Sequence, residues 1–251
     1  MTAEAIVAAI SVLVSIAIAL AEGTWHWRRR RLPDYDSPLR FGDIDEARSF
    51  SVQDLVKVVN LQNSPSLDPQ NPGSALLSDA YLVQRESEGG TGLVSIYSTR
   101  GQLSASSASH PHQYESGDYD STHMVTNQAV GVPLSGLAQG VPSPVINRVA
   151  FIGAYDGVTD EFFETHIERP TKSLTIILIF TQRYRCTEAF GSVQTGARSR
   201  VEPARVKPMI LDDGRIVYWH VTPVKTDWLP IHARYRVRWK WRDVDRWTAS
   251  H

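Results

Sequence analysis

The sequence predicts a mainly β protein, with a single N-terminal transmembrane helix followed by an antiparallel β-sandwich or barrel-like domain that contains one or two short helices. Two observations predict this class. Residues 5–21 form one uncharged apolar run, whereas short alternating apolar runs separated by turn residues dominate after residue 74. Because these runs follow one another without a regular alternation of strand and helix patterns, antiparallel pairing is favoured over a doubly wound parallel sheet.

The apolar run 5–21 predicts a membrane anchor within residues 1–27. As a helix, a run of this length would span roughly 25 Å, near the lower limit for crossing a bilayer. Trp25 and Trp27 stand where an interfacial aromatic belt would lie, and four cations follow them, namely Arg28, Arg29, Arg30 and Arg31. The positive-inside rule then places the short N-terminus outside and the C-terminal domain in the cytoplasm. A cleaved signal peptide and a buried core helix are the alternatives.

Small residues lie along one stripe of this predicted anchor. Ala8, Ser11 and Ser15 recur at helical spacing, and small residues on one stripe let two membrane helices approach closely. We therefore expect the anchor to be a contact in a homo-oligomer. The alternative is that any alanine-rich apolar helix carries small residues on every face.

Residues 28–74 are predicted to be a juxtamembrane segment. It contains an amphipathic helix over 51–62, because Ser51 and Asp54 form a capping pattern and Val52, Leu55 and Val59 recur at helical spacing. Prolines and a glycine over 63–74 then indicate a linker.

Residues 75–251 are predicted to be the β-rich globular domain. A glycine-rich segment over 88–92 indicates a hairpin, and Asp212, Asp213 and Gly214 indicate a second one. The uninterrupted β-branched run 174–180 is typical of a strand that is buried on both faces. A short helix is expected over 159–168. The other predicted strands cover residues 80–85, 93–99, 145–155, 207–211, 215–221 and 231–241.

The final strand carries the most informative binding pattern. Its side chains alternate between cations and large apolar residues, so a row of cations would line one face at a spacing of about 6.5 to 7 Å. The row consists of Arg234, Arg236, Arg238, Lys240 and Arg242. Such a row suits the phosphates of anionic lipid or nucleic acid. The alternative is pairing of these cations with carboxylates on a neighbouring strand.

Three histidines near the middle of the chain contain the atoms for a metal site. His110, His112 and His123 lie among carboxylates, but their spacing matches no metal motif that we can identify. The surrounding serine-rich residues 104–121 are typical of a flexible loop, which would not hold ligands in place. No metal, cofactor or small-molecule substrate is therefore assigned from the sequence.

Composition leaves the function class open. The formal net charge is −1, so the whole chain has no general basic excess of the kind that nucleic-acid-binding domains show, and a single cysteine excludes an internal disulfide. With no recognisable catalytic motif, the expectation is a non-enzymatic, membrane-anchored scaffold or interaction protein, such as a matrix-like or envelope-associated virion component or a bacterial inner-membrane protein, which engages partner proteins and anionic head groups. The alternatives are a membrane-tethered, metal-dependent enzyme that uses the histidines and a nucleic-acid-binding module that uses the final strand.

Overall fold

The computed structural model of the chain describes residues 50–61, 75–86, 92–99, 101–120, 125–134, 136–155, 161–180, 186–196, 199–210, 216–221 and 228–241. They all belong to one unit, residues 34–251. The predicted anchor with Ala8, Ser11 and Ser15 lies outside these ranges, as do Trp25, Trp27, the arginines at 28–31, His123 and Arg242. In the described part of the chain, no helix has the length and apolarity to cross a membrane.

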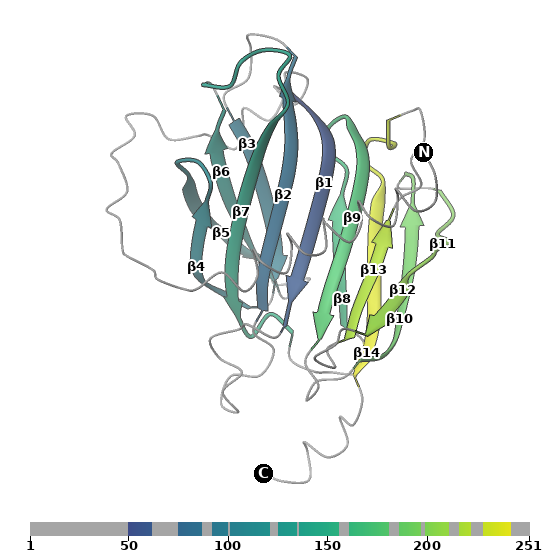
Figure 1. The fold of residues 1–251 in the computed structure, drawn as a ribbon. Helices are drawn as coiled ribbons and strands as arrows, with labels where there is room; N and C mark the ends of the chain where they lie inside the picture. The colour runs from purple at the N-terminus through teal and green to yellow at the C-terminus, as the bar shows by residue number, and fades with distance from the viewer. Residues whose placement is uncertain are drawn as a thin grey trace. The chain divides into compact units, whose positions relative to one another are not determined.

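Fourteen strands in three sheets make up the regular structure of these residues (Figure 1). The seven-stranded sheet, called sheet A here, has the order β12-β13-β9-β1-β2-β7-β4. Its strands are, in chain order, β1 (Phe50–Asn60), β2 (Ala75–Arg85), β4 (Gln102–Ala108), β7 (Ser143–Ile152), β9 (Thr171–Phe180), β12 (Lys207–Ile210) and β13 (Ile216–Val221). The mainly β class predicted from the sequence is confirmed.

Two smaller sheets lie on one face of sheet A (Figure 1). Sheet B has the order β3-β6-β5, with strands β3 (Gly92–Thr99), β5 (Gln113–Asp120) and β6 (Val125–Pro133). Sheet C has the order β11-β10-β14-β8, with strands β8 (Glu161–His166), β10 (Cys186–Gln194), β11 (Glu202–Ala204) and β14 (Arg234–Trp241).

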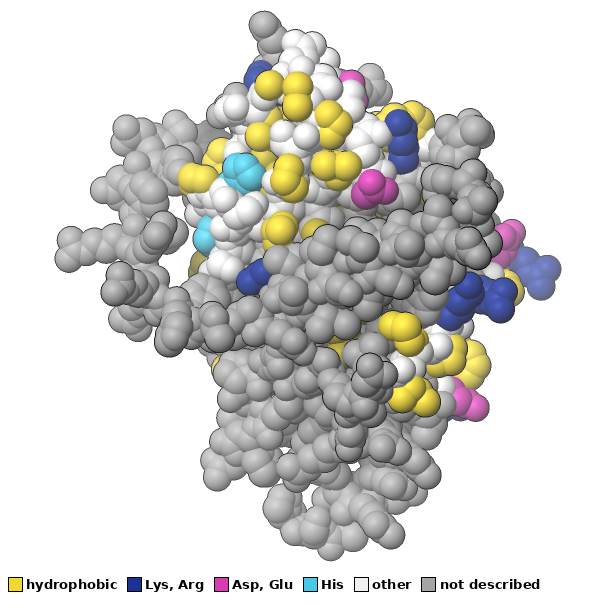
Figure 2. Space-filling view, viewed as in Figure 1, with side chains coloured by type: hydrophobic (Ala, Val, Ile, Leu, Met, Phe, Trp, Pro, Cys, Tyr) yellow, Lys and Arg dark blue, Asp and Glu magenta, His cyan; other side chains and the backbone are white. Residues whose placement is uncertain are grey.

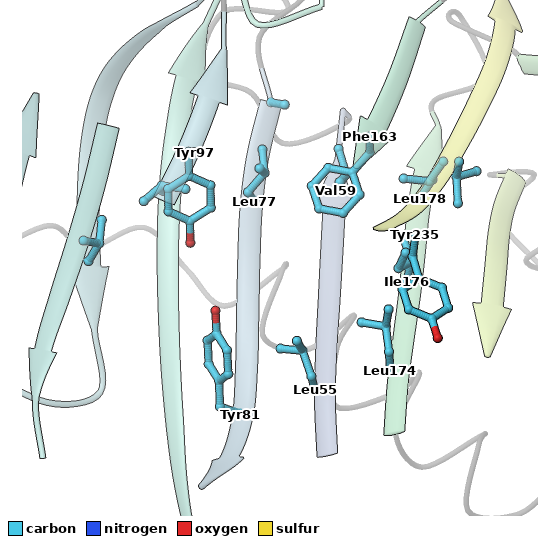
Figure 3. Close-up of a cluster of buried hydrophobic side chains, with 14 of the residues drawn as sticks. Leu55, Val59, Leu77, Tyr81, Tyr97, Phe163, Leu174, Ile176, Leu178 and Tyr235 are labelled. Carbon is cyan, nitrogen blue, oxygen red and sulfur yellow. The ribbon is translucent and has the colours of Figure 1, made fainter. Parts of the chain in front are cut away.

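The core lies between sheet A and the two smaller sheets (Figure 3). Directly paired residues share a face of a sheet, and the inward row of sheet A includes Leu77, Val59 and Leu178. Tyr97 of sheet B packs against Phe151 of β7, with ring centroids 5.8 Å apart. In sheet C, the ring of Trp239 lies 5.7 Å from that of Phe180 on β9. Burial of these apolar side chains is the main favourable contribution to folding.

The segment predicted as an amphipathic helix over 51–62 is strand β1, so that prediction is wrong. β1 pairs antiparallel with β2 on one side and parallel with β9 on the other, which places it inside sheet A. Val56, Val58 and Val59 explain this outcome, because β-branched side chains favour the extended backbone when neighbouring strands are available. The β1–β9 pair also makes sheet A mixed rather than antiparallel.

Three further local predictions are wrong. Residues 159–168 contain strand β8 and not a helix, because Phe163 and Thr165 point inward while Phe162 is exposed, a period of two. The described part of the serine-rich stretch, residues 104–120, contains most of β4 and all of β5, which pair with β7 and β6. β2 and β3 do not form a hairpin, since they lie in different sheets.

Each strand predicted from the sequence overlaps an observed strand, and two of these predictions include further detail that is also confirmed. The run 174–180 lies in β9, where every side chain except that of Thr175 is buried. β12 and β13 pair antiparallel on either side of Asp212–Gly214, as the turn residues indicated.

Candidate functional site

The outward face of sheet C carries the cations that the sequence predicts. On β14, Tyr235, Val237 and Trp239 are buried, so the residues between them point away from the core. These outward residues are Arg234, Arg236, Arg238 and Lys240, and we call the outward face of sheet C the basic face. The alternation predicted for this strand is confirmed over 234–240.

Aromatic side chains flank the cations on both sides. Arg238 on β14 lies directly opposite Phe162 of β8 on one side and Phe190 of β10 on the other. The two phenylalanines are 47% and 53% exposed. Because directly paired residues share a face, the three side chains form one row across the middle of the basic face. Folding gains little from large apolar rings left in water.

Arg236 and Lys240 form ion pairs with carboxylates on neighbouring strands. Arg236 places Nε and Nη2 each 2.7 Å from Oε2 of Glu164. Lys240 Nζ lies 3.7 Å from Oε2 of Glu188, and both side chains are more than half exposed. Pairing with carboxylates on neighbouring strands, the alternative considered from the sequence, is therefore present at these two positions.

Glu164 connects Arg236 to a histidine. His166 Nε2 donates to Oε1 of Glu164 at 2.8 Å. Burial raises the pKa of Glu164, but the hydrogen bond from His166 and the charge of Arg236 lower the pKa by more than burial raises it. The pKa of Glu164 therefore lies below its usual value. Glu164 therefore stays ionised and holds the Arg236 guanidinium over the Phe162 ring, at 4.5 Å from its centroid.

Further exposed cations lie on either side of β11 in the chain. Arg200, Arg205 and Lys207 are exposed and lie around β11 and β12. In the view of Figure 2, described Lys and Arg side chains gather along the right-hand side, near β11.

A second cluster of polar groups is buried between sheets A and B. Lys57 on β1 lies directly opposite Asp79 on β2, and its Nζ is 2.7 Å from Oδ2 of Asp79. The same oxygen accepts hydrogen bonds from Tyr97 at 2.8 Å and from Tyr81 at 3.2 Å. Figure 3 shows these two tyrosines converging from opposite layers. We call this group, completed by Ser95 and Asn147, the buried polar cluster.

The charges of the buried polar cluster support one another. Burial lowers the pKa of Lys57, but the Asp79 carboxylate more than reverses this, so the ammonium stays charged. Burial and the Asp79 charge together raise the pKa of Tyr81 to about 12. The tyrosines therefore remain neutral donors, and the cluster joins the two layers. Because the cluster is enclosed between the two layers, we assign it a structural role.

Of the three histidines near the middle of the chain, His110 and His112 lie within the described residues, and each lies near a serine hydroxyl. His110 Nδ1 lies 2.9 Å from Ser109 Oγ, and His112 Nε2 lies 3.4 Å from Ser106 Oγ. Within the described ranges, no three His, Cys, Asp or Glu side chains are grouped to hold a metal ion.

The two phenylalanines of the basic face and the whole buried polar cluster were not predicted from the sequence. The sequence pattern does not identify Phe162 and Phe190, because it predicts a helix where β8 lies and no strand where β10 lies. The buried polar cluster was missed as well. Its signal is a charged residue at an inward position, since Lys57 lies between Leu55 and Val59 on a strand of period two.

No protein-family model and no curated protein matches the chain. Among solved structures it is similar to a putative protease from Parabacteroides distasonis ATCC 8503, with a TM-score of 0.43 and 8% identity over 76% of this chain and 40% of that chain. For yeast LTA4 hydrolase in complex with bestatin the TM-score is 0.39 and the identity 7%, over 84% and 31% of the two chains. For an alpha-L-fucosidase from Vibrio sp. strain EJY3 the TM-score is 0.21 and the identity 11%, over 70% of this chain and 36% of that chain. The chain thus spans less than half the length of each.

Proposed function

We propose that the chain is a non-enzymatic, membrane-tethered interaction protein whose cytoplasmic domain, a β-sandwich, binds an anionic partner through the basic face. The observation that carries this proposal is the outward row of four cations on β14, in which Arg236 is partly exposed and the other three are exposed. Within this row, two exposed phenylalanines flank Arg238. An open row of side chains suits contact with an extended surface, whereas small-molecule sites are usually concave and enclose their ligand.

The chemistry of the cations supports an anionic partner that carries phosphate or carboxylate groups. Arginine offers a planar fork of donors that matches both groups. The Arg236–Glu164 pair illustrates this preference for a carboxylate within the protein itself. Outward residues on a strand recur at about 6.6 Å, so neighbouring cations on β14 would contact separate anionic groups.

The tether in this proposal is the apolar run 5–21. Trp25 and Trp27 would lie at the interface, and Arg28, Arg29, Arg30 and Arg31 would face the anionic cytoplasmic leaflet. Protease treatment of sealed inner-membrane vesicles or cells tests this orientation. A C-terminal domain that is digested only from the cytoplasmic side supports it, and a domain that is digested only from the outside contradicts it.

Charge reversal on the basic face tests the binding function. The full chain in neutral detergent would be titrated with inorganic polyphosphate and with dioctanoyl phosphatidylserine. We expect the Arg234→Glu/Arg238→Glu double variant to weaken binding at least about tenfold, and raised salt to weaken binding by the unmodified chain. The matched control is Lys172→Glu, a charge reversal at an exposed position on β9. Equal losses for the face variants and the control would exclude the basic face as the site.

A further inference from the structure

We propose that the anionic partner of the basic face is single-stranded nucleic acid, held by phosphate contacts to the cations of β14 and by base stacking on Phe162 and Phe190. This inference rests on the proposed function, because it names the ligand class of the same site. Two observations carry it: the two exposed rings and the spacing of the cations, both on the outward face of the four-stranded sheet C.

The exposed rings are the first observation. Phe162 and Phe190 lie on the two strands that flank β14, and both are about half exposed. Arg236 lies over one ring at 4.5 Å and Lys240 lies near the other at 6.0 Å from its centroid. Because Arg236 covers one face of the Phe162 ring, a base would stack on the opposite face of that ring, with a cation within reach of its phosphate. Aromatic rings on an open sheet are a common platform for unstacked bases.

The spacing of the cations is the second observation. Successive outward residues of β14 are separated by about 6.6 Å, the rise of two residues of a strand. This separation is close to that of neighbouring phosphates in an extended single strand. An extended nucleic acid strand could therefore follow β14, with Arg234, Arg236 and Arg238 each near one phosphate.

The arrangement favours a single strand over a duplex or a lipid surface. In a duplex the bases are stacked on one another, so the phenylalanines could not reach their faces. A lipid head group has no π-face to stack. Insertion of the two rings into the apolar part of a bilayer would also bring in Glu164 and Glu188, which lie on the same face, and burial of these carboxylates is costly.

Glu188, a carboxylate of the basic face, allows a test that distinguishes nucleic-acid binding from a purely structural role of the cations. Glu188 lies 3.7 Å from Lys240, with both side chains largely in solvent. Its negative charge opposes a polyanion, so Glu188→Gln should strengthen binding of an oligonucleotide by about two- to fivefold at low salt. If Glu188 only held a structural cation, the substitution would leave binding unchanged or weaken it.

The experiment is fluorescence anisotropy with the full chain in neutral detergent and a labelled oligothymidylate as probe. We expect salt-sensitive binding that is tighter than binding of a duplex of the same length. Phe162→Ala/Phe190→Ala should weaken it at least about tenfold, and Phe162→Trp/Phe190→Trp should retain it. The matched control is Tyr114→Ala on β5, a ring that is 52% exposed on another sheet. A thermal melt of each variant checks that it is folded.

The outcomes separate this inference from the proposed function. Equal binding of single strand and duplex, with the phenylalanine variants no weaker than the Tyr114 control, overturns the inference but leaves an anion-binding face. Binding of dioctanoyl phosphatidylserine without binding of the oligonucleotide overturns it in favour of a lipid. If neither probe nor polyphosphate binds, the proposed function fails as well.

Discussion

Asp79 is the residue on which the buried polar cluster depends. One of its oxygens accepts from Lys57, Tyr81 and Tyr97, which belong to three different strands. Burial of a single charge is costly, and an ion pair offsets that cost only when its remaining hydrogen bonds are also made. Here the two tyrosine hydroxyls supply them. The cluster therefore fixes the alignment of β1, β2 and β3 as well as the contact between the layers.

Substitution of Asp79 should destabilise the protein more than substitution of Lys57. Asp79→Leu leaves a buried ammonium and two hydroxyls without their acceptor, and we expect it to lower the free energy of unfolding by about 3–5 kcal/mol. Lys57→Met leaves a carboxylate that still has two donors, so its cost is smaller. Urea denaturation measures the free energy of unfolding of both variants. The control is Glu188→Gln at an exposed position, which should lower this free energy by less than about 1 kcal/mol. Equal costs would show that Asp79 is not the central acceptor.

The tyrosines of the cluster predict alkaline sensitivity. The pKa of Tyr81 rises from 10.0 to about 12 in the folded protein, chiefly through burial and then through the Asp79 charge. Above pH 10 the unfolded chain loses this proton while the folded chain keeps it, so stability falls between about pH 10 and about pH 12. Tyr97 and Lys57 shift in the same direction. Thermal melts across this range measure how steeply the midpoint temperature falls with pH, and Tyr81→Phe should make this fall shallower. An unchanged pH dependence in Tyr81→Phe would contradict the role given to Tyr81.

At the scale of the element, Gly101 controls the passage from β3 in sheet B to β4 in sheet A. A Cβ at this position would lie 2.6 Å from the backbone nitrogen of Ala154 and 2.7 Å from the carbonyl oxygen of Ile152. Neither backbone atom can move away without distorting the end of β7. The close approach thus requires a residue without a side chain.

Gly101→Ala should therefore destabilise the protein by about 1–3 kcal/mol, the usual range for overpacking. Gly136→Ala is the matched control, because a Cβ there would meet nothing within 4 Å. We expect the control to change the thermal midpoint little. Hydrogen exchange should show the loss of protection concentrated in β4 and the end of β7; uniform loss would contradict this local explanation.

β14 and β1 show what the sequence could and could not predict about the elements. In β14 the alternation of cations with Tyr235, Val237 and Trp239 matches the burial of the strand, because one face meets water and the other the core. In β1 the alternation is masked by Lys57 at an inward position. That position is acceptable only because Asp79 lies opposite it, a pairing that no local pattern contains.

The sequence predicts the cations of the candidate site but not its aromatic residues. Its cations follow from a single strand, whereas its aromatic residues come from two strands that the chain brings beside β14 from distant positions. Phe162 lies outward only because β8 pairs with β14 in the observed register. A shift of one residue would turn it inward, and register is set by tertiary pairing that the local sequence does not determine.

For the whole molecule, the position of β1 sets the shortest chain that should fold. β1 contributes Phe50, Val52, Leu55 and Val59 to the core and has a partner on both edges. A chain that begins at residue 75 would expose the edges of β2 and β9 and lose these core side chains. We expect it to aggregate, while a chain that begins at residue 34 gives a cooperative thermal transition. Circular dichroism and gel filtration compare the two, and a folded, monomeric 75–251 chain would contradict the role given to β1.

The parallel pair of β1 and β9 also has a consequence for biosynthesis. Val52 pairs with Thr171, so roughly half the chain must leave the ribosome between the synthesis of one strand and the arrival of its partner. Throughout that interval one edge of an apolar, valine-rich strand has no neighbour. Long-range β pairing is slow and leaves such edges open to association with other chains. Nascent chains of this protein should therefore need chaperone protection until β9 has been made.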